Sequence, residues 1–130
     1  MIITPLIAAA CGLIYVVLSL RVIRIRFTER ISLGHGDHKP LMKAVRTHAN
    51  FAEYVPLTLL LLWFVETLTM SSNLVLVLGV IFIAARLCHV IGMENPKQYM
   101  ILRQAGIVTT HGILIICSLY LIYWYLPIRF

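Results

Sequence analysis

The stretch from Arg46 to Pro56 places several strongly polar side chains directly before an almost wholly apolar segment. Arg46, Asn50 and Glu53 fall within about 60° of one another on a helical wheel, whereas His48 points to the opposite side. A cation, an amide and a carboxylate are costly to keep at the edge of a membrane. These residue types on one helical stripe therefore indicate a site that holds a polar ligand.

The composition of the chain is that of a membrane protein. Of its 130 residues, 61% are hydrophobic and 12% are charged, and the mean hydropathy is +0.93. A soluble domain carries about 25% charged residues, and about 20 apolar residues in a helix cross a bilayer. We expect a single all-α membrane domain over residues 1–130, without a soluble module. Its four expected spans are residues 1–25, 41–70, 73–93 and 99–126.

The basic residues are distributed unevenly. Of the eleven Lys and Arg residues, seven lie between the first and second spans and three flank the connection between the third and fourth. Because positive residues favour the cytoplasmic side, we expect both basic connections to be cytoplasmic and both termini to lie outside. The net charge of +6 also attracts anionic lipid headgroups. It does not indicate nucleic-acid binding, since no basic stripe is free of the membrane.

Two other groups of residues could suggest metal or redox chemistry, and both have a simpler interpretation. His35, Asp37 and His38 lie on a short loop, but a zinc site needs further ligands and a rigid frame, so we expect a solvated turn and no metal. The three cysteines lie in separate apolar segments without C-x-x-C spacing, and we expect them to be small core residues.

Further polar groups lie in the third and fourth spans. Arg86 and His89 are three residues apart and share a helical face. An arginine at mid-membrane costs about 2.5–3.5 kcal/mol, so we expect Arg86 to face the bundle interior with Glu53 as its partner. Such a pair could also be purely structural. The fourth helix is expected to begin near Gln98, which places Arg103 as another cation at the membrane edge.

Three local features concern the ends and the middle of the first two spans. Pro56 removes a backbone hydrogen bond and crowds the carbonyl of Ala52, so we expect a kink and a cleft there. Glu66, near the far end of the second helix, is expected at the membrane interface. No basic residue precedes the first span, so we expect that span to remain in place rather than to be cleaved as a signal.

Two motifs, R-x-H-x-N-x-x-E-Y-x-P in the second expected helix and A-R-L-x-H-x-x-G in the third, carry a resemblance to a known family. The chain resembles the membrane-associated proteins in eicosanoid and glutathione metabolism (MAPEG), and its L-G-H-G-D loop is similar to the bacterial YecN-like branch. The resemblance implies a left-handed four-helix bundle that forms a homotrimer in the bacterial inner membrane. It also implies that glutathione binds in clefts between neighbouring subunits, near the cytoplasmic side.

The resemblance also implies roles for individual residues. Arg103 is similar in place to the arginine that stabilises the glutathione thiolate, after a shift in loop length, and is the implied catalytic residue. Arg26 resembles a first-helix contact. The implied contacts in the second and third helices are Arg46, His48, Asn50, Glu53, Tyr54, Arg86 and His89. Where characterised members often carry a tyrosine, this chain has Met93, which offers no hydroxyl donor.

The chemistry of glutathione agrees with these residues. Its two carboxylates and one ammonium call for several arginines and one acid, and charge-assisted hydrogen bonds are the strong ones. A thiol has a pKa of about 8.5, and an adjacent guanidinium favours the thiolate. The thiolate would then attack a lipophilic electrophile dissolved in the bilayer.

Three functions are compatible with the sequence. The leading hypothesis is a glutathione-dependent transferase or peroxidase that acts on lipophilic electrophiles. The alternative is a non-catalytic glutathione- or lipid-binding membrane scaffold of the same fold, which Met93 favours. A small multidrug exporter is a weaker third, because proton-coupled export calls for a membrane-embedded carboxylate, commonly in the first span, and residues 1–20 contain none.

Overall fold

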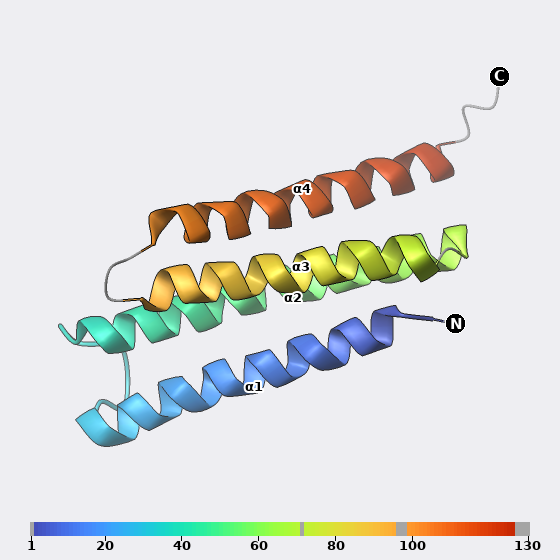
Figure 1. The fold of residues 1–130 in the computed structure, drawn as a ribbon. Coiled ribbons are helices and arrows are strands. Elements are labelled where there is room, and N and C mark those ends of the chain that lie inside the picture. Colours follow the sequence, from blue (N-terminus) through green and yellow to red (C-terminus); the bar gives the residue numbers. More distant parts are fainter. Residues whose placement is uncertain (1, 71, 96–98, 127–130) are drawn as a thin grey trace.

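The computed structural model describes residues 2–70, 72–95 and 99–126, and over these residues the chain is all-α (Figure 1). Its helices are α1 (Thr4–Glu29), α2 (Lys39–Thr69), α3 (Ser72–Glu94) and α4 (Met100–Tyr125). Each helix is long and apolar enough to cross a membrane, which confirms the predicted membrane bundle of four helices. Gln98, where the sequence places the start of the fourth helix, lies outside the described residues, as do the basic residues Lys97 and Arg129.

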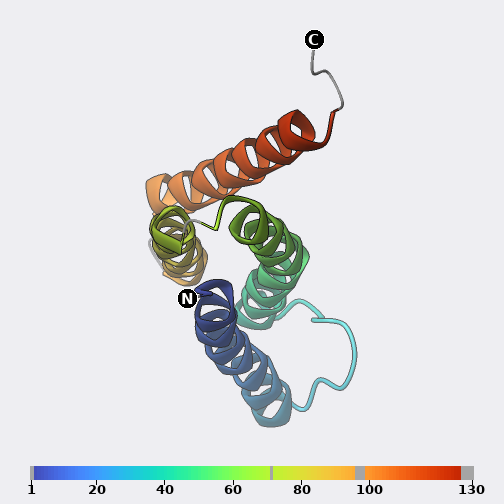
Figure 2. The same ribbon diagram turned by 90° about the vertical axis from the view of Figure 1, so that its right-hand side faces the viewer.

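α2 and α3 form the middle of the bundle, with α1 on one side and α4 on the other (Figure 2). Within the described residues, α1 packs against α2 and α3, and α4 packs against the same two helices, but α1 and α4 share no contact. The start of α1 and the end of α2 lie at one end of the bundle, which we call the Glu66 end. The end of α1 and the starts of α2 and α4 lie at the other, which we call the basic end.

The bundle is apolar outside and partly polar inside. Many Leu, Ile, Val and aromatic side chains are exposed along all four helices, as is expected of surfaces that contact lipid. The interior contains an apolar core and, within it, several buried polar side chains. The core includes Phe51, Leu62, Val75, Phe82 and Cys117. The buried polar side chains include Thr47, Thr58, Arg86, His89 and Thr110.

Two glycines allow α3 and α4 to approach closely at the basic end. A Cβ atom at Gly106 would overlap the carbonyl oxygen of Ala85 and the backbone nitrogen of His89. A Cβ atom at Gly92 would overlap the backbone nitrogen of Arg103. Small residues of this kind let membrane helices pack backbone to backbone. The first turns of α4 are therefore held directly against the end of α3.

At the opposite end, Glu66 of α2 caps the start of α1. Its carboxylate accepts hydrogen bonds from the backbone N–H of Ile3 (2.6 Å), the backbone N–H of Thr4 (2.9 Å) and the Thr4 hydroxyl (2.6 Å). The side chain is 3% exposed, because it is buried against the start of α1 at the end of the bundle. The first N–H groups of a helix have no partner within it and carry partial positive charge. A carboxylate from the neighbouring helix satisfies them.

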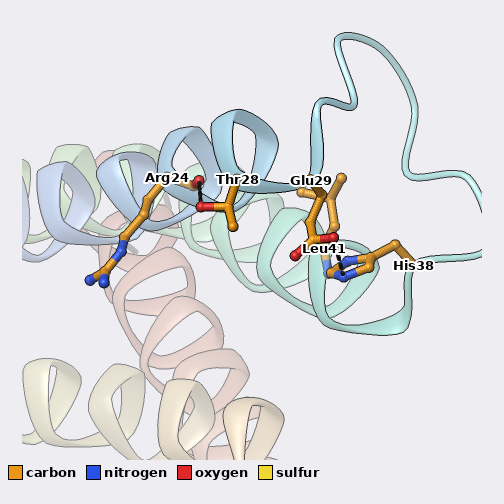
Figure 3. Close-up of polar contacts among 5 residues, drawn as sticks. All are labelled: Arg24, Thr28, Glu29, His38 and Leu41. Carbon is orange, nitrogen blue, oxygen red and sulfur yellow. Dashed lines mark hydrogen bonds and ion pairs between the residues drawn. The ribbon is translucent and has the colours of Figure 1, made fainter.

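Local side-chain contacts fix the connection between α1 and α2 (Figure 3). The His38 Nδ1 atom accepts a hydrogen bond from the Leu41 backbone N–H at 3.1 Å and so caps the start of α2. The His38 Nε2 atom lies 3.7 Å from Glu29 Oε2, at the end of α1. Within the last turns of α1 itself, the Thr28 hydroxyl donates to the Arg24 carbonyl at 3.0 Å. Among the described residues, no group of three or more His, Cys, Asp and Glu side chains is placed to hold a metal ion.

Candidate functional site

A cleft of about 190 Å³ at the basic end brings together three cations from two helices. Lys43 and Arg46 come from α2 and Arg103 comes from the first turn of α4. The remaining lining residues are Met42, Gly92, Met93 and Met100. Arg46 and Arg103 are exposed, and within the described part of the chain none of the three cations forms an ion pair. Concentrated, unpaired positive charge of this kind attracts an anion with more than one acidic group.

Deeper in the bundle, Arg86 joins α2, α3 and α4. Its side chain is 1% exposed, which confirms that it faces the interior. Its guanidinium donates to Asn50 Oδ1 at 2.5 Å and to the Thr110 hydroxyl at 3.4 Å. The same group lies 5.8 Å from the Phe51 ring centre and 5.9 Å from that of Tyr54. Amide, hydroxyl and aromatic groups therefore take the place of a carboxylate around this buried cation.

The predicted pairing of Arg86 with Glu53 is wrong in the single chain. Glu53 is exposed on α2, and Arg86 forms no ion pair with any described residue. The physical reason is the direction of the two α2 side chains. Asn50 is turned far enough toward α3 to reach the guanidinium, whereas Glu53 points outward. The structural Arg86–Glu53 pair considered from the sequence is absent for the same reason.

His89 does not line the cleft, but it contacts the backbone of Arg103, which does. Its side chain is 2% exposed, and its Nδ1 atom lies 3.3 Å from the Arg103 carbonyl oxygen, to which it can donate. This hydrogen bond and the close packing at Gly92 both hold the backbone of Arg103. His89 therefore positions Arg103 instead of lining the cleft itself.

The other predicted site residues are dispersed. The His48 ring faces α1 and stacks near Tyr15, with ring centres 4.7 Å apart. Tyr54 lies beside Arg86, with its ring centre 5.1 Å from that of His111. The Arg26 guanidinium donates to the Ile31 carbonyl at 3.3 Å and to the next carbonyl at 3.4 Å. Within one chain, Arg26, His48 and Glu53 are thus not gathered with Arg46 and Arg103.

Two contributors to this region are not among the site residues predicted from the sequence. Lys43 lines the cleft one helical turn before Arg46, and that spacing on a single helical face was its signal. Thr110 bonds Arg86, and its hydroxyl also donates to the Gly106 carbonyl at 2.8 Å. A threonine in an apolar helix gives no signal of its own, because such hydroxyls usually bond only their own helix backbone.

Comparison with known proteins gives a match over nearly the whole chain. The model of the MAPEG family matches residues 4–123, which include part or all of every helix. The inner membrane protein YecN of Escherichia coli (strain K12) is 29% identical over 125 residues, which cover 96% of this chain and 93% of that protein. The protein of the same name from Escherichia coli O6:H1 (strain CFT073) gives the same identity and coverage.

Proposed function

This chain belongs to the MAPEG family, and we propose that it is a membrane enzyme that binds glutathione and transfers it to lipophilic electrophiles, or uses it to reduce them. The family includes glutathione transferases and related membrane proteins. The observation that carries the proposal is the cleft of Lys43, Arg46 and Arg103, which holds three cations without a carboxylate partner among the described residues. We further propose that the protein lies in the bacterial inner membrane, with the basic end in the cytoplasm.

The chemistry of the cleft suits a small dianion that also carries a thiol. Arg46 and Lys43 can pair with the two carboxylates of glutathione, and charge-assisted hydrogen bonds are the strongest available. Arg103, held in place by His89, is then the group that faces the thiol. A guanidinium beside a thiol favours the thiolate, which is the nucleophile. The electrophile arrives from the bilayer, which contacts the exposed apolar side chains of the helices.

We also propose a homotrimer, because a single chain leaves two features incomplete. Glu53 is exposed about 21 Å along α2 from Lys39, near the middle of the helix, where a carboxylate facing lipid is costly. The cleft of about 190 Å³ is also smaller than the roughly 300–1,000 Å³ typical of small-molecule sites. A neighbouring subunit on this face would cover Glu53 and enlarge the cleft.

The test is thiolate formation. Glutathione is titrated into the purified protein, and the ultraviolet absorbance of the thiolate is followed against pH. The wild type should bind glutathione and lower the pKa of its thiol. Arg103→Ala should lose the thiolate signal while it keeps part of the binding. An unchanged thiol pKa in the wild type would contradict the proposal, and equal loss of both signals would move the thiolate role to another residue.

A second candidate function has one specific observation in its favour. Met93 lines the cleft at the position where the family resemblance implies a tyrosine. A thioether cannot donate a hydrogen bond to the sulfur, so the cleft would bind glutathione without activating it. A non-catalytic scaffold predicts tight glutathione binding with no turnover across a panel of electrophiles. Met93→Tyr would then be expected to introduce turnover.

A further inference from the structure

Three of the five methionines line the cleft at the basic end, together with its three cations. Met42 comes from α2, Met93 from α3 and Met100 from α4. Apart from Gly92, every described residue that lines the cleft is therefore either a cation or a methionine. The cations can donate hydrogen bonds to a guest, and the thioether sulfurs are the oxidisable groups in the wall. The proposed glutathione chemistry uses the cations but gives these sulfurs no part.

Two of the thioethers lie one helical turn from a cleft arginine. Met42 precedes Arg46 by four residues on α2, and Met100 precedes Arg103 by three residues on α4. Side chains at these spacings are neighbours on a helix surface, with Cβ atoms about 5–6 Å apart. Both methionines are open to small molecules, since 39% of Met42 and 54% of Met100 is exposed. A small guest in the cleft can therefore contact a sulfur and a guanidinium at the same time.

Met70, just after the end of α2, provides a comparison within the same chain. Its exposed fraction is 85%, which is larger than that of Met42 or Met100. It lines a hollow of about 160 Å³ that contains the Glu66 carboxylate and, among the described residues, no cation. If exposure alone governed reactivity, Met70 would be oxidised first. If the neighbouring cations govern it, the cleft methionines would be oxidised first.

We propose that the cleft is a methionine oxidation site, in which the arginines hold a hydroperoxide against the thioethers and promote transfer of one oxygen atom. The sulfur lone pair attacks the terminal peroxide oxygen, the O–O bond breaks and the S=O bond of a sulfoxide forms. The sulfur loses two electrons and the hydroperoxide is reduced to an alcohol, or to water when it is hydrogen peroxide. The proton of the transferred hydroxyl passes to the departing oxygen. A guanidinium that donates to this oxygen stabilises the negative charge that develops on it.

Oxidation should also weaken the binding of glutathione, a step that rests on the proposed function. A thioether is a weak hydrogen-bond acceptor, whereas a sulfoxide is polar. A sulfoxide oxygen beside Arg46 or Arg103 accepts hydrogen bonds from the guanidinium and so competes with the carboxylates of glutathione. We expect about tenfold weaker binding, which corresponds to the loss of about one charge-assisted hydrogen bond. Because sulfoxide reductases restore the thioether, the change is reversible.

The test is oxidation of the purified full-length protein by hydrogen peroxide, without glutathione, followed at each methionine by peptide mass spectrometry. Met42 and Met100 should gain oxygen about tenfold faster than Met70, because a hydrogen bond to the departing oxygen lowers the barrier. In protein unfolded by dodecyl sulfate, the three rates should be equal. Oxidation of Met70 in the folded protein as fast as that of Met42 and Met100 would overturn the proposal.

Matched arginine variants test the part of the guanidinium groups. Arg46→Gln should slow the oxidation of Met42, and Arg103→Gln should slow that of Met100, each toward the rate of the unfolded protein. Arg24→Gln removes an exposed cation outside the cleft and should leave both rates unchanged. Fast oxidation that survives both cleft variants would show that the arginines do not promote the reaction.

Glutathione binding tests the consequence of oxidation. Peroxide-treated wild type should bind about tenfold more weakly than reduced wild type, and treatment with methionine sulfoxide reductases should restore binding. A variant with leucine in place of Met42, Met93 and Met100 should bind equally before and after peroxide. Equal binding by treated and reduced wild type would overturn the step from oxidation to weaker binding. If reduced wild type bound no glutathione, the proposed function would fail and this step with it, while the oxidation rates would still decide the oxidation site.

Discussion

The two ends of the bundle hold charged side chains in opposite ways. At the Glu66 end, one buried carboxylate receives three hydrogen bonds from the start of α1. At the basic end, Lys43, Arg46 and Arg103 line an open cleft, and none has a carboxylate partner among the described residues. A fully bonded buried charge fixes one arrangement of helices, whereas unpaired cations at an open surface attract a ligand. Stability and ligand binding should therefore be separable by mutation.

Removal of the Glu66 carboxylate should give the largest effect on stability. Glu66→Ala leaves two buried N–H groups and the Thr4 hydroxyl without their partner. We expect a loss of about 3 kcal/mol in the free energy of unfolding, because each buried unpaired donor is costly. Unfolding in mixed micelles with increasing dodecyl sulfate, followed by circular dichroism, measures it. Glu66→Gln keeps one acceptor oxygen and should lose less, and neither variant should change glutathione affinity.

The contact between α3 and α4 can be broken without a change in charge. Gly106→Ala places a Cβ atom against the Ala85 carbonyl and the His89 backbone, and should cost about 2 kcal/mol by overpacking. Because this contact holds α4 against the cleft, glutathione binding should weaken as well. Gly112→Ala is the matched control, since its Cβ meets open space. Equal unfolding curves for the two variants would contradict the close approach of these helices.

Neutralisation of a cleft cation should affect binding and leave stability unchanged. Arg46→Gln removes an exposed charge that has no ion-pair partner in the described chain, so unfolding should be unaffected. Glutathione should bind about tenfold more weakly through the loss of a charge-assisted hydrogen bond. Arg24→Gln removes an exposed cation outside the cleft and serves as the control. Isothermal titration calorimetry on both variants separates a specific effect from a general change in net charge.

The ion pair between Arg21 and Glu94 should contribute least. It joins α1 to the end of α3, but the Arg21 side chain is 41% exposed. Partly exposed pairs contribute up to about 1 kcal/mol. A double-mutant cycle with Arg21→Gln and Glu94→Gln, read out by the same unfolding assay, should give a coupling energy within that range. A much larger coupling would show that the basic end also carries a structural charge contact like that of Glu66.

The sequence was sufficient to predict four membrane-spanning helices, because long apolar runs report directly on such helices. It also predicted that Arg86 faces the interior, since a lipid-facing arginine is costly. It failed for the partner of Arg86, because a helical wheel does not resolve whether Asn50 or Glu53 points at a neighbouring helix. The packing of α3 against α2 decides in favour of Asn50.

Contacts that depend on the order of helices in space could not be predicted. Glu66 bonds residues that lie 62 and 63 positions away in the sequence, so no local pattern reveals it as a cap. The helical wheel predicts that His48 faces away from Arg46, but that α1 and its Tyr15 lie on that side follows only from the arrangement of the helices. The sequence shows that these polar side chains lie in apolar helices, but their contacts depend on the tertiary structure.

The most direct test of the contrast between the two ends is a structure of the assembled protein in a bilayer mimetic with glutathione present. The account predicts density for the tripeptide at the basic end, with its carboxylates at Lys43 and Arg46 and its sulfur toward Arg103, and an unchanged Glu66 contact with Thr4. An assembly in which Glu53 of a neighbouring subunit neutralises these cations and leaves no cavity between subunits would contradict it.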